Sequence, residues 1–348
     1  MRIGGGRGVD RRIVSSRGAC PVTLLPIMRR TALRFSFLAL LAAACGSRTG
    51  LFTDPNEFGP NDVVDGGNTD GSIRDGGRRD RQPPEEDALP PIDARPPVDV
   101  NRNDCPDANA TLIYVISADY QLYSFYPPDG TFTFIGNIAC PAPPGDTPFS
   151  MAVDRKGTAF ILFTDERLYR VSTLNAACVG TPYVPGQSNF GQFGMGFATN
   201  DIGPTETLYV SGDGRDSRST DLARIDVTTW KLTPVGDPGV DRAELTGTGD
   251  GRLFAFYTKR FTSNGPPSYI GEINPQTAQV TAEKRFDTVD QGDAWAFAFW
   301  GGDFYMFHSP FGSSIVTRWR PADDSVAQVA TLPTRIVGAG VSTCAPQQ

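Results

Sequence analysis

The stretch that decides the fold is residues 149–183, which read FSMAVDRKGTAFILFTDERLYRVSTLNAACVGTPY. It divides into four short runs that are apolar or alternate between apolar and polar residues, and turn-forming residues separate them. The runs are Ser150–Val153, Thr158–Thr164, Arg167–Ser172 and Cys178–Tyr183. We therefore expect four consecutive short strands in this stretch.

The same unit recurs through the rest of the chain after residue 110. Its third strand begins at Leu122, Leu168, Leu222, Ile270 and Val316, so the intervals are 46, 54, 48 and 46 residues. A small, apolar first strand precedes four of the units, at residues 150–153, 194–198, 244–247 and 294–299. Internal repeats with periods of roughly 20–50 residues are typical of propellers and solenoids.

The first unit has no first strand before it, and a spare copy lies near the C-terminal end, at Ile336–Val341. A C-terminal strand that completes the first blade would close a ring and remove free sheet edges. The sequence thus predicts an all-β fold, a β-propeller of five four-stranded blades over residues 105–348. Six blades, a β-sandwich and a looser β-solenoid are the alternatives.

The repeat pattern over residues 110–344 resembles that of gluconolactonase-like and NHL-like propellers. The resemblance lies in the order of strands within each unit, and it covers the whole predicted ring. It implies a fold that serves both enzymes and binding proteins, so it does not by itself imply a reaction.

Residues 28–45 have the plan of an export signal that starts at Met28. Arg29, Arg30 and Arg34 supply the positive charges, and Phe35–Leu41 is the apolar region. This apolar region is too short for a membrane-spanning helix, which needs about 20 residues. We expect the signal region to cover residues 1–45.

The end of this region, LAAACG at residues 41–46, resembles the lipobox of bacterial lipoproteins. The resemblance implies that Cys45 carries the lipid and that acyl chains anchor the protein in a membrane. It further implies an outer-membrane lipoprotein of the cell envelope, on its periplasmic or surface side. The alternative is an ordinary secretory signal with a small-residue cleavage site.

Residues 46–104 form a predicted linker between the signal region and the propeller. The segment is rich in Asp, Pro and Gly, has almost no aromatic residues and shows no periodicity. Such a composition cannot bury enough apolar surface to offset the entropy of ordering, so we expect a disordered tether.

The cysteines offer a test, because an exported protein lies where disulfides persist. Apart from Cys20 and Cys45, four cysteines remain, and they allow three pairings: Cys105, Cys140, Cys178 and Cys344. Cys105 precedes the second strand of the first blade, and Cys344 follows the strand that closes it. We therefore expect a Cys105–Cys344 disulfide. Cys140 and Cys178 would pair by elimination, although they belong to different blades.

The site should lie at one end of the central channel, where connections between blades meet the loops between second and third strands. We expect seven side chains around this mouth: Gln192, Asp241, Arg242, Glu244, Asp293, Trp295 and Arg335. The carboxylates of Asp241, Glu244 and Asp293 could hold a hard cation such as Ca²⁺. Otherwise they are solvated rim residues, and no cofactor is expected.

Composition excludes several functions. The chain has one histidine, His308, which excludes multi-histidine metal sites and argues against a histidine-based catalytic triad. Neither Gly-x-Ser-x-Gly nor a glycine-rich phosphate loop occurs. The net charge of -7 and the lack of a basic stripe argue against nucleic acid as a partner.

These observations favour a non-enzymatic, monomeric binding propeller that is lipid-anchored in the cell envelope. Its partner would be an envelope protein, a glycan or a small molecule. One alternative is a divalent-metal-dependent hydrolase, similar to a lactonase, with the three carboxylates as ligands. Another alternative is a structural envelope protein that binds no small ligand.

Overall fold

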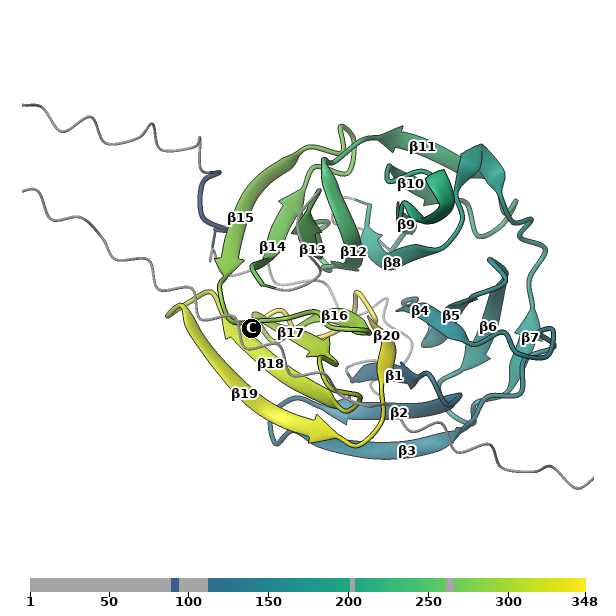
Figure 1. The fold of residues 1–348 in the computed structure, drawn as a ribbon, viewed down its shortest axis with the longest axis horizontal. Coiled ribbons are helices and arrows are strands. Elements are labelled where there is room, and N and C mark those ends of the chain that lie inside the picture. Colours follow the sequence, from purple (N-terminus) through teal and green to yellow (C-terminus); the bar gives the residue numbers. More distant parts are fainter. Residues whose placement is uncertain (1–88, 94–111, 201–203, 261–265) are drawn as a thin grey trace, which may run out of the picture. The chain divides into compact units, whose positions relative to one another are not determined.

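The computed structural model describes residues 89–93, 112–200, 204–260 and 266–348. In these ranges, five antiparallel sheets of four strands each surround a common centre, as the blades of a propeller do (Figure 1). The predicted five-bladed fold is confirmed. Within the described ranges, no helix is long and apolar enough to cross a membrane. The predicted export signal, the predicted lipidation at Cys45 and most of the predicted linker lie outside the described residues.

The blades follow the chain in order, and each is built from the inside outward. Blade 1 contains β20 (Ile336–Val341), β1 (Ile113–Ser117), β2 (Gln121–Tyr126) and β3 (Thr131–Asn137). Blade 2 contains β4 (Pro148–Val153), β5 (Thr158–Phe163), β6 (Leu168–Ser172) and β7 (Cys178–Gly180). Blade 3 contains β8 (Phe193–Thr199), β9 (Glu206–Gly212), β10 (Leu222–Ile225) and β11 (Leu232–Gly236). Blade 4 contains β12 (Val240–Gly247), β13 (Leu253–Lys259), β14 (Ser268–Ile273) and β15 (Val280–Phe286). Blade 5 contains β16 (Trp295–Trp300), β17 (Asp303–His308), β18 (Ser314–Arg320) and β19 (Ser325–Leu332).

The C-terminal strand closes the ring, as the sequence predicts. β20 pairs antiparallel with β1, and Ala339 lies opposite Val115. Phe125 of β2 then packs against blade 5, with its ring centroid 5.9 Å from that of Tyr305 and 5.6 Å from that of Phe307. The first and last parts of the described propeller are thus held together by both a hydrogen-bonded ladder and an aromatic cluster.

Apolar side chains fill the spaces between neighbouring blades. The buried residues form five hydrophobic clusters, one for each pair of adjacent blades. Successive side chains of a strand point to opposite faces of its sheet, so each blade supplies apolar groups to both neighbours. This explains why the second strands read as nearly continuous apolar runs.

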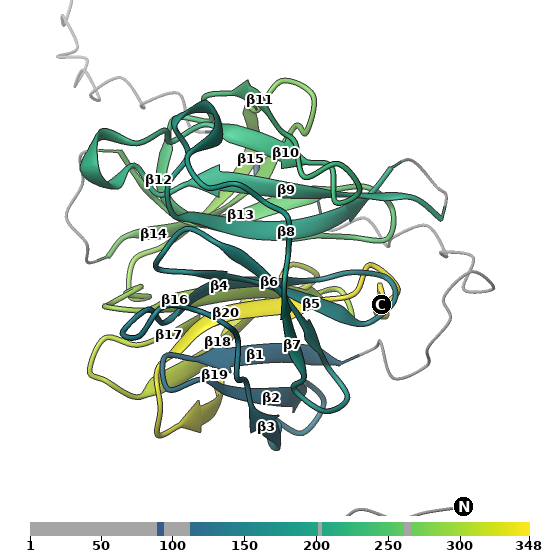
Figure 2. The same ribbon diagram turned by 90° about the vertical axis from the view of Figure 1, so that its right-hand side faces the viewer.

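Small residues allow the innermost strands to approach one another closely. β20 runs beside β4 in both views (Figure 1, Figure 2). A Cβ at Gly338 would lie 2.6 Å from the backbone nitrogen of Met151, and one at Gly340 would lie 2.8 Å from that of Val153. Backbone contact of this kind requires glycine. The crowded centre leaves the two ends of the channel as the places where side chains from several blades converge.

The two faces of the ring differ in what they carry. The mouth face carries the connections between blades and the loops between second and third strands. The opposite face carries the turns between first and second strands, such as Gly301–Gly302 of blade 5. The C-terminal residues follow β20 onto the opposite face, where the Gly301 N–H donates to the Pro346 carbonyl at 2.7 Å.

Residues 89–93 also pack against the ring, near the opposite face. The N–H of Glu283 in β15 donates to the carbonyl of Pro90 at 3.0 Å, and Ile92 is buried in the cluster between blades 4 and 5. A single cavity is lined by Ile92, the Gly301–Gly302 turn and Gln348. At these five residues the structure differs from the expectation of a disordered linker, because the Ile92 side chain packs into the apolar cluster between blades 4 and 5.

One disulfide lies between described cysteines, and it joins neighbouring blades. Cys140, which follows β3 of blade 1, is bonded to Cys178 in β7 of blade 2. The sequence argument gave this pair weaker support because the two residues belong to different blades. The outer edges of adjacent blades nevertheless meet there, with the two Cα atoms 5.0 Å apart. Cys344 is buried. Cys105 lies outside the described residues, so the Cys105–Cys344 disulfide stays a prediction.

Candidate ligand-binding site at the channel mouth

A pocket of about 160 Å³ opens at the mouth face, and all five blades contribute to it. Blade 1 supplies Ala118, Arg335 and Val337, and blade 2 supplies Thr147, Pro148, Phe149 and Thr164. Blades 3 and 4 supply one residue each, Arg215 and Glu244. Blade 5 supplies Asp293, Ala294 and Trp295. Four of the seven residues predicted for the mouth line it, namely Glu244, Asp293, Trp295 and Arg335. The site therefore depends on the whole ring and not on one blade.

A bulge in the inner strand of blade 4 shapes one wall. The register of β12 against β13 shifts between Asp241 and Glu244, and Arg242 has a positive φ of 55°. Bulges of this kind re-aim side chains and are frequent beside functional sites. Here the guanidinium carbon of Arg242 lies 3.9 Å from the ring centroid of Trp295, and its Nη2 donates to the Gly292 carbonyl at 2.6 Å. Arg242 and Trp295 are thus fixed against each other.

Two donors on this wall lack a hydrogen-bond partner. The indole Nε1 of Trp295 and Nη1 of Arg242 are both buried, and neither donates to any described residue. A buried donor that is left unsatisfied costs roughly 1–3 kcal/mol, so native structures rarely leave one without a reason. An acceptor that enters the pocket would explain the Trp295 donor, because Trp295 lines the pocket and Arg242 does not.

A second wall comes from the connection between β9 and β10. Arg215 lies in the short 3₁₀ turn η4 (Arg215–Ser217), forms an ion pair with Asp213 and donates from Nη1 to Oε1 of Gln192 at 3.3 Å. Its guanidinium carbon lies 5.4 Å from the ring centroid of Phe149, which gives a cation–π contact. Gln192 in turn donates from Nε2 to the Thr164 carbonyl at 3.2 Å. These contacts hold the exposed Arg215 side chain over the pocket.

The floor carries a buried carboxyl group with a raised pKa. Glu244 is 3% exposed, and Oγ of Ser150 donates to its Oε2 at 2.8 Å. Burial raises the pKa of Glu244 well above its ordinary value, although the Ser150 hydrogen bond opposes this effect. Burial also raises the pKa of Asp213 to about 6, against the opposing charge of Arg215.

The three carboxylates predicted as calcium ligands do not converge on one point. Asp241 turns outward to Arg260, at 3.4 Å, while Glu244 is buried against Ser150 and Asp293 is exposed at the rim. In the described ranges, no three His, Cys, Asp or Glu side chains lie close enough together to hold a metal ion. These residues therefore do not fit a bound Ca²⁺ in this arrangement.

His308 is the last residue of β17 and is buried. Its Nδ1 lies 2.8 Å from the Asp290 carbonyl and its Nε2 lies 2.9 Å from Oγ1 of Thr317. Burial lowers the pKa of His308 below its ordinary value. Both ring nitrogens are thus engaged in contacts within the protein.

Gln192 and Arg242 also belong to the site, since each contacts a lining residue. Phe149, Asp213 and Arg215 were not predicted from the sequence. The last two lie at the long loop between a second and a third strand, but loop length alone does not show which side chain turns inward. A Cβ at Gly212 would collide with the Ser219 carbonyl, so glycine is required where this loop folds back.

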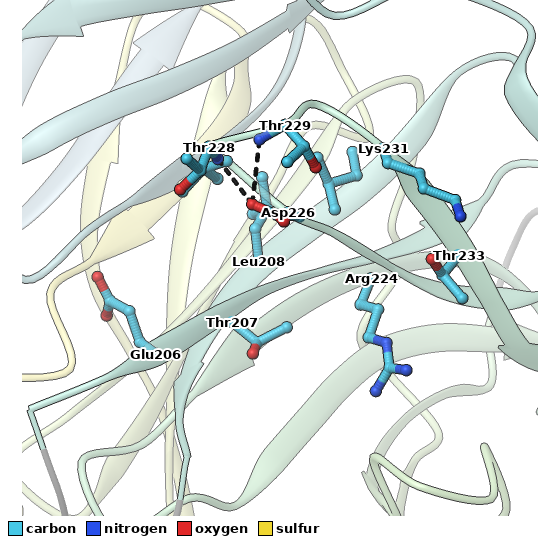
Figure 3. Close-up of a pocket in the computed structure, with 11 residues that line it drawn as sticks. Glu206, Thr207, Leu208, Arg224, Asp226, Thr228, Thr229, Lys231 and Thr233 are labelled. Carbon is cyan, nitrogen blue, oxygen red and sulfur yellow. Dashed lines mark hydrogen bonds between the residues drawn. The ribbon is translucent and has the colours of Figure 1, made fainter.

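Other pockets are repeated features of the blades. A groove of about 380 Å³ on blade 3 is lined by the first residues of β9, the end of β10 and the turn that follows (Figure 3). In this turn, Oδ1 of Asp226 accepts from the backbone N–H groups of Thr228 and Thr229 (Figure 3). A groove of about 340 Å³ occupies the equivalent position on blade 2. Grooves that recur at one place in the repeat follow from the blade geometry and do not mark a site.

No protein-family model and no curated protein matches the chain. Solved structures do resemble it. A chain in the crystal structure of a nidogen/laminin complex is 11% identical, with 67% of this chain and 98% of that chain covered and a TM-score of 0.45. A protein of unknown function from Bacteroides caccae is 12% identical, with 65% and 84% covered and a TM-score of 0.38. TolB from Acinetobacter baumannii is 13% identical, with 62% and 52% covered and a TM-score of 0.37. Likeness at this level identifies neither a family nor a function.

Proposed function

We propose that this protein is a lipid-anchored, monomeric binding propeller of the cell envelope, and that it binds its partner at the channel mouth. The observation that carries the proposal is the convergence of all five blades on one pocket lined by Trp295, whose buried indole N–H has no partner among the described residues. Pockets with a few convergent polar groups and perturbed pKa values are the usual place of binding. The partner would be a small molecule, a glycan or a group presented by an envelope protein.

The position of the described linker residues supports the same proposal. Residues 89–93 dock near the face opposite the mouth, against β15 and the Gly301–Gly302 turn. A tether that reaches the ring there leaves the mouth free for a partner. The plan of residues 28–45 and the lipobox-like segment that contains Cys45 support the anchor.

Binding can be tested by capture from an envelope extract. The purified full chain would be immobilised beside a mouth variant, Trp295→Phe with Arg335→Gln, and beside a groove variant on blade 3, Arg224→Gln with Lys231→Gln. We expect the wild type and the groove variant to retain the same molecule, and the mouth variant to lose it. Equal retention by all three chains, with circular dichroism showing intact folds, would contradict a partner at the mouth.

The anchor has a separate test. Cys45→Ser should release the protein from the membrane fraction and abolish incorporation of radiolabelled palmitate, because the thiol that receives the lipid is gone. Ser47→Ala, two residues after Cys45, is the matched control, because it leaves the thiol in place and should change neither property. Membrane retention and labelling of Cys45→Ser at the wild-type level would exclude Cys45 as the lipid-bearing residue.

A further inference from the structure

We infer that the channel mouth recognises a carboxylate group on a small molecule, with Trp295 and the lining arginines of blades 1 and 3 supplying the donors. The inference rests on the proposed function, because it names the chemistry of the ligand that the mouth would bind. It follows from three properties of the pocket: its buried donors, its charges and its size.

The first property is that the buried groups without partners on this wall can only donate. An indole N–H and a guanidinium N–H have no acceptor capacity, whereas a carboxylate is an acceptor with about four lone-pair positions. Trp295 is 7% exposed, it lines the pocket, and its Nε1 has no partner within the described ranges. The Nη1 of Arg242, whose guanidinium covers the Trp295 ring, is also buried and has no hydrogen-bond partner within the described ranges. A ligand that reaches the Trp295 donor must offer an acceptor, whereas Arg242 does not itself line the pocket.

The second property is the balance of charge. Two arginines line the pocket and are exposed, Arg215 from blade 3 and Arg335 from the connection between β19 and β20. Of the two acidic residues in the lining, Glu244 is buried, and burial raises its pKa well above the ordinary value of a glutamate. The lining thus holds two arginines and one exposed carboxylate, Asp293, while Arg215 also pairs with Asp213 outside the lining. Arginine pairs with carboxylates through parallel N–H···O bonds, which favours this group over a neutral amide or an alcohol.

The third property is the size of the pocket together with its aromatic walls. A cavity of about 160 Å³ admits a carboxylate and a small body, such as one ring, and any larger molecule must extend out of the mouth. Phe149 and Trp295 offer apolar surface on two sides of this space. Aromatic faces that contact the body and donors that contact the carboxylate would together fix the orientation of the ligand.

The experiment uses probes that differ in one group. Isothermal titration calorimetry would be performed on the purified full chain with sodium benzoate, benzamide and benzylamine, and with sodium acetate to test the carboxylate alone. We expect benzoate to bind saturably, and benzamide and benzylamine to bind at least about tenfold more weakly, since a hydrogen bond to a charged group contributes about 1.5–3 kcal/mol. Acetate should bind in competition with benzoate.

Two variants place the interaction at the mouth. Trp295→Phe keeps the aromatic face and removes only the indole donor, and Arg335→Gln removes a cation from an exposed loop, so both should fold. Each should weaken benzoate binding by about tenfold. Arg224→Gln on the outer part of blade 3 is the control and should leave the affinity unchanged, because Arg224 lies in the groove of Figure 3 and not at the mouth.

Each outcome decides the question. Preference for benzylamine or benzamide, or benzoate binding that neither mouth variant weakens, would overturn the inference. If neither benzoate nor acetate binds, but capture from the envelope still depends on Trp295 and Arg335, the inference fails and the proposed function stands. If the probes fail and capture is also independent of the mouth, both fail.

Discussion

Glu206, at the start of β9, joins three parts of the ring through its carboxylate. Its Oε1 accepts the backbone N–H of Arg155 from blade 2 at 2.7 Å, and its Oε2 accepts Oγ1–H of Thr343 from the C-terminal segment at 3.0 Å. Burial is the main influence on this group and raises its pKa to about 7, although both hydrogen bonds oppose the shift. A group with a raised folded-state pKa makes stability depend on pH.

The direction of this dependence can be derived. Between the ordinary pKa of a glutamate and about pH 7, the native state holds a proton on Glu206 that the unfolded chain has released. The free energy of unfolding should therefore fall as the pH rises through this window and level off above it. Each pKa unit corresponds to about 1.4 kcal/mol, so the fall due to Glu206 is about 3 kcal/mol.

Urea unfolding of the wild type and of Glu206→Gln between pH 5 and 8 measures this effect. The amide cannot titrate, so the difference in unfolding free energy between the two proteins should shift by about 3 kcal/mol in favour of the variant as the pH rises. Other buried carboxyls, such as Glu244 and Asp213, contribute equally to both curves. Two parallel curves would show that Glu206 titrates alike in the folded and unfolded states.

For single residues, the sequence predicts which side chains lie at the channel mouth better than it predicts which groups they contact. Glu244, Asp293, Trp295 and Arg335 were predicted at the mouth because each lies at or beside the start of an inner strand. Their partners could not be predicted in the same way. The stacking of Arg242 on Trp295 depends on a bulge with a positive φ at a non-glycine residue, and no local pattern in the sequence indicates it.

Among the strands, β20 shows how glycine residues allow close packing of two backbones. Its glycines allow the backbone to lie directly against β4, where a Cβ at Gly338 would stand 2.6 Å from the Met151 nitrogen. Gly338→Ala should therefore push two inner strands apart and lower the free energy of unfolding by about 1–3 kcal/mol. Chemical denaturation with a fluorescence readout would measure the change.

Gly180→Ala in the edge strand β7 is the matched control. No described atom lies within 4 Å of a Cβ at this position, so the substitution should change the free energy of unfolding by less than about 1 kcal/mol. If the two alanine variants were equally stable, close approach of the inner strands would not be what the glycines provide.

The strand pattern itself was readable from the sequence, since the periodic apolar runs and the turn residues between them agree with β4–β6 to within two residues. The outermost strand of blade 2 was expected over residues 178–183 but ends at Gly180. Outer strands have one unpaired edge and fewer buried side chains, so their ends depend on neighbouring blades. The same neighbourhood brings Cys140 to Cys178, which sequence distance alone does not favour.

At the scale of the whole ring, closure by β20 fixes the distance between blades and thereby the geometry of the mouth. The pocket takes residues from each blade, so a ligand at the mouth would contact the entire ring at once. Residues 89–93 dock near the opposite face, so the proposed lipid anchor would approach the ring away from the proposed binding site. The ring could be predicted because its units repeat, whereas the chemistry of the mouth does not repeat from blade to blade.

The most direct test of ligand binding at the mouth uses the indole signals of the protein. The chain contains four tryptophans, and Trp295→Phe identifies the Nε1–H resonance of Trp295 in a ¹H–¹⁵N spectrum. Titration with sodium benzoate should move this resonance to saturation and leave the signals of Trp230, Trp300 and Trp319 in place. A Trp295 resonance that stays fixed, or four resonances that drift together without saturation, would contradict a carboxylate-binding mouth.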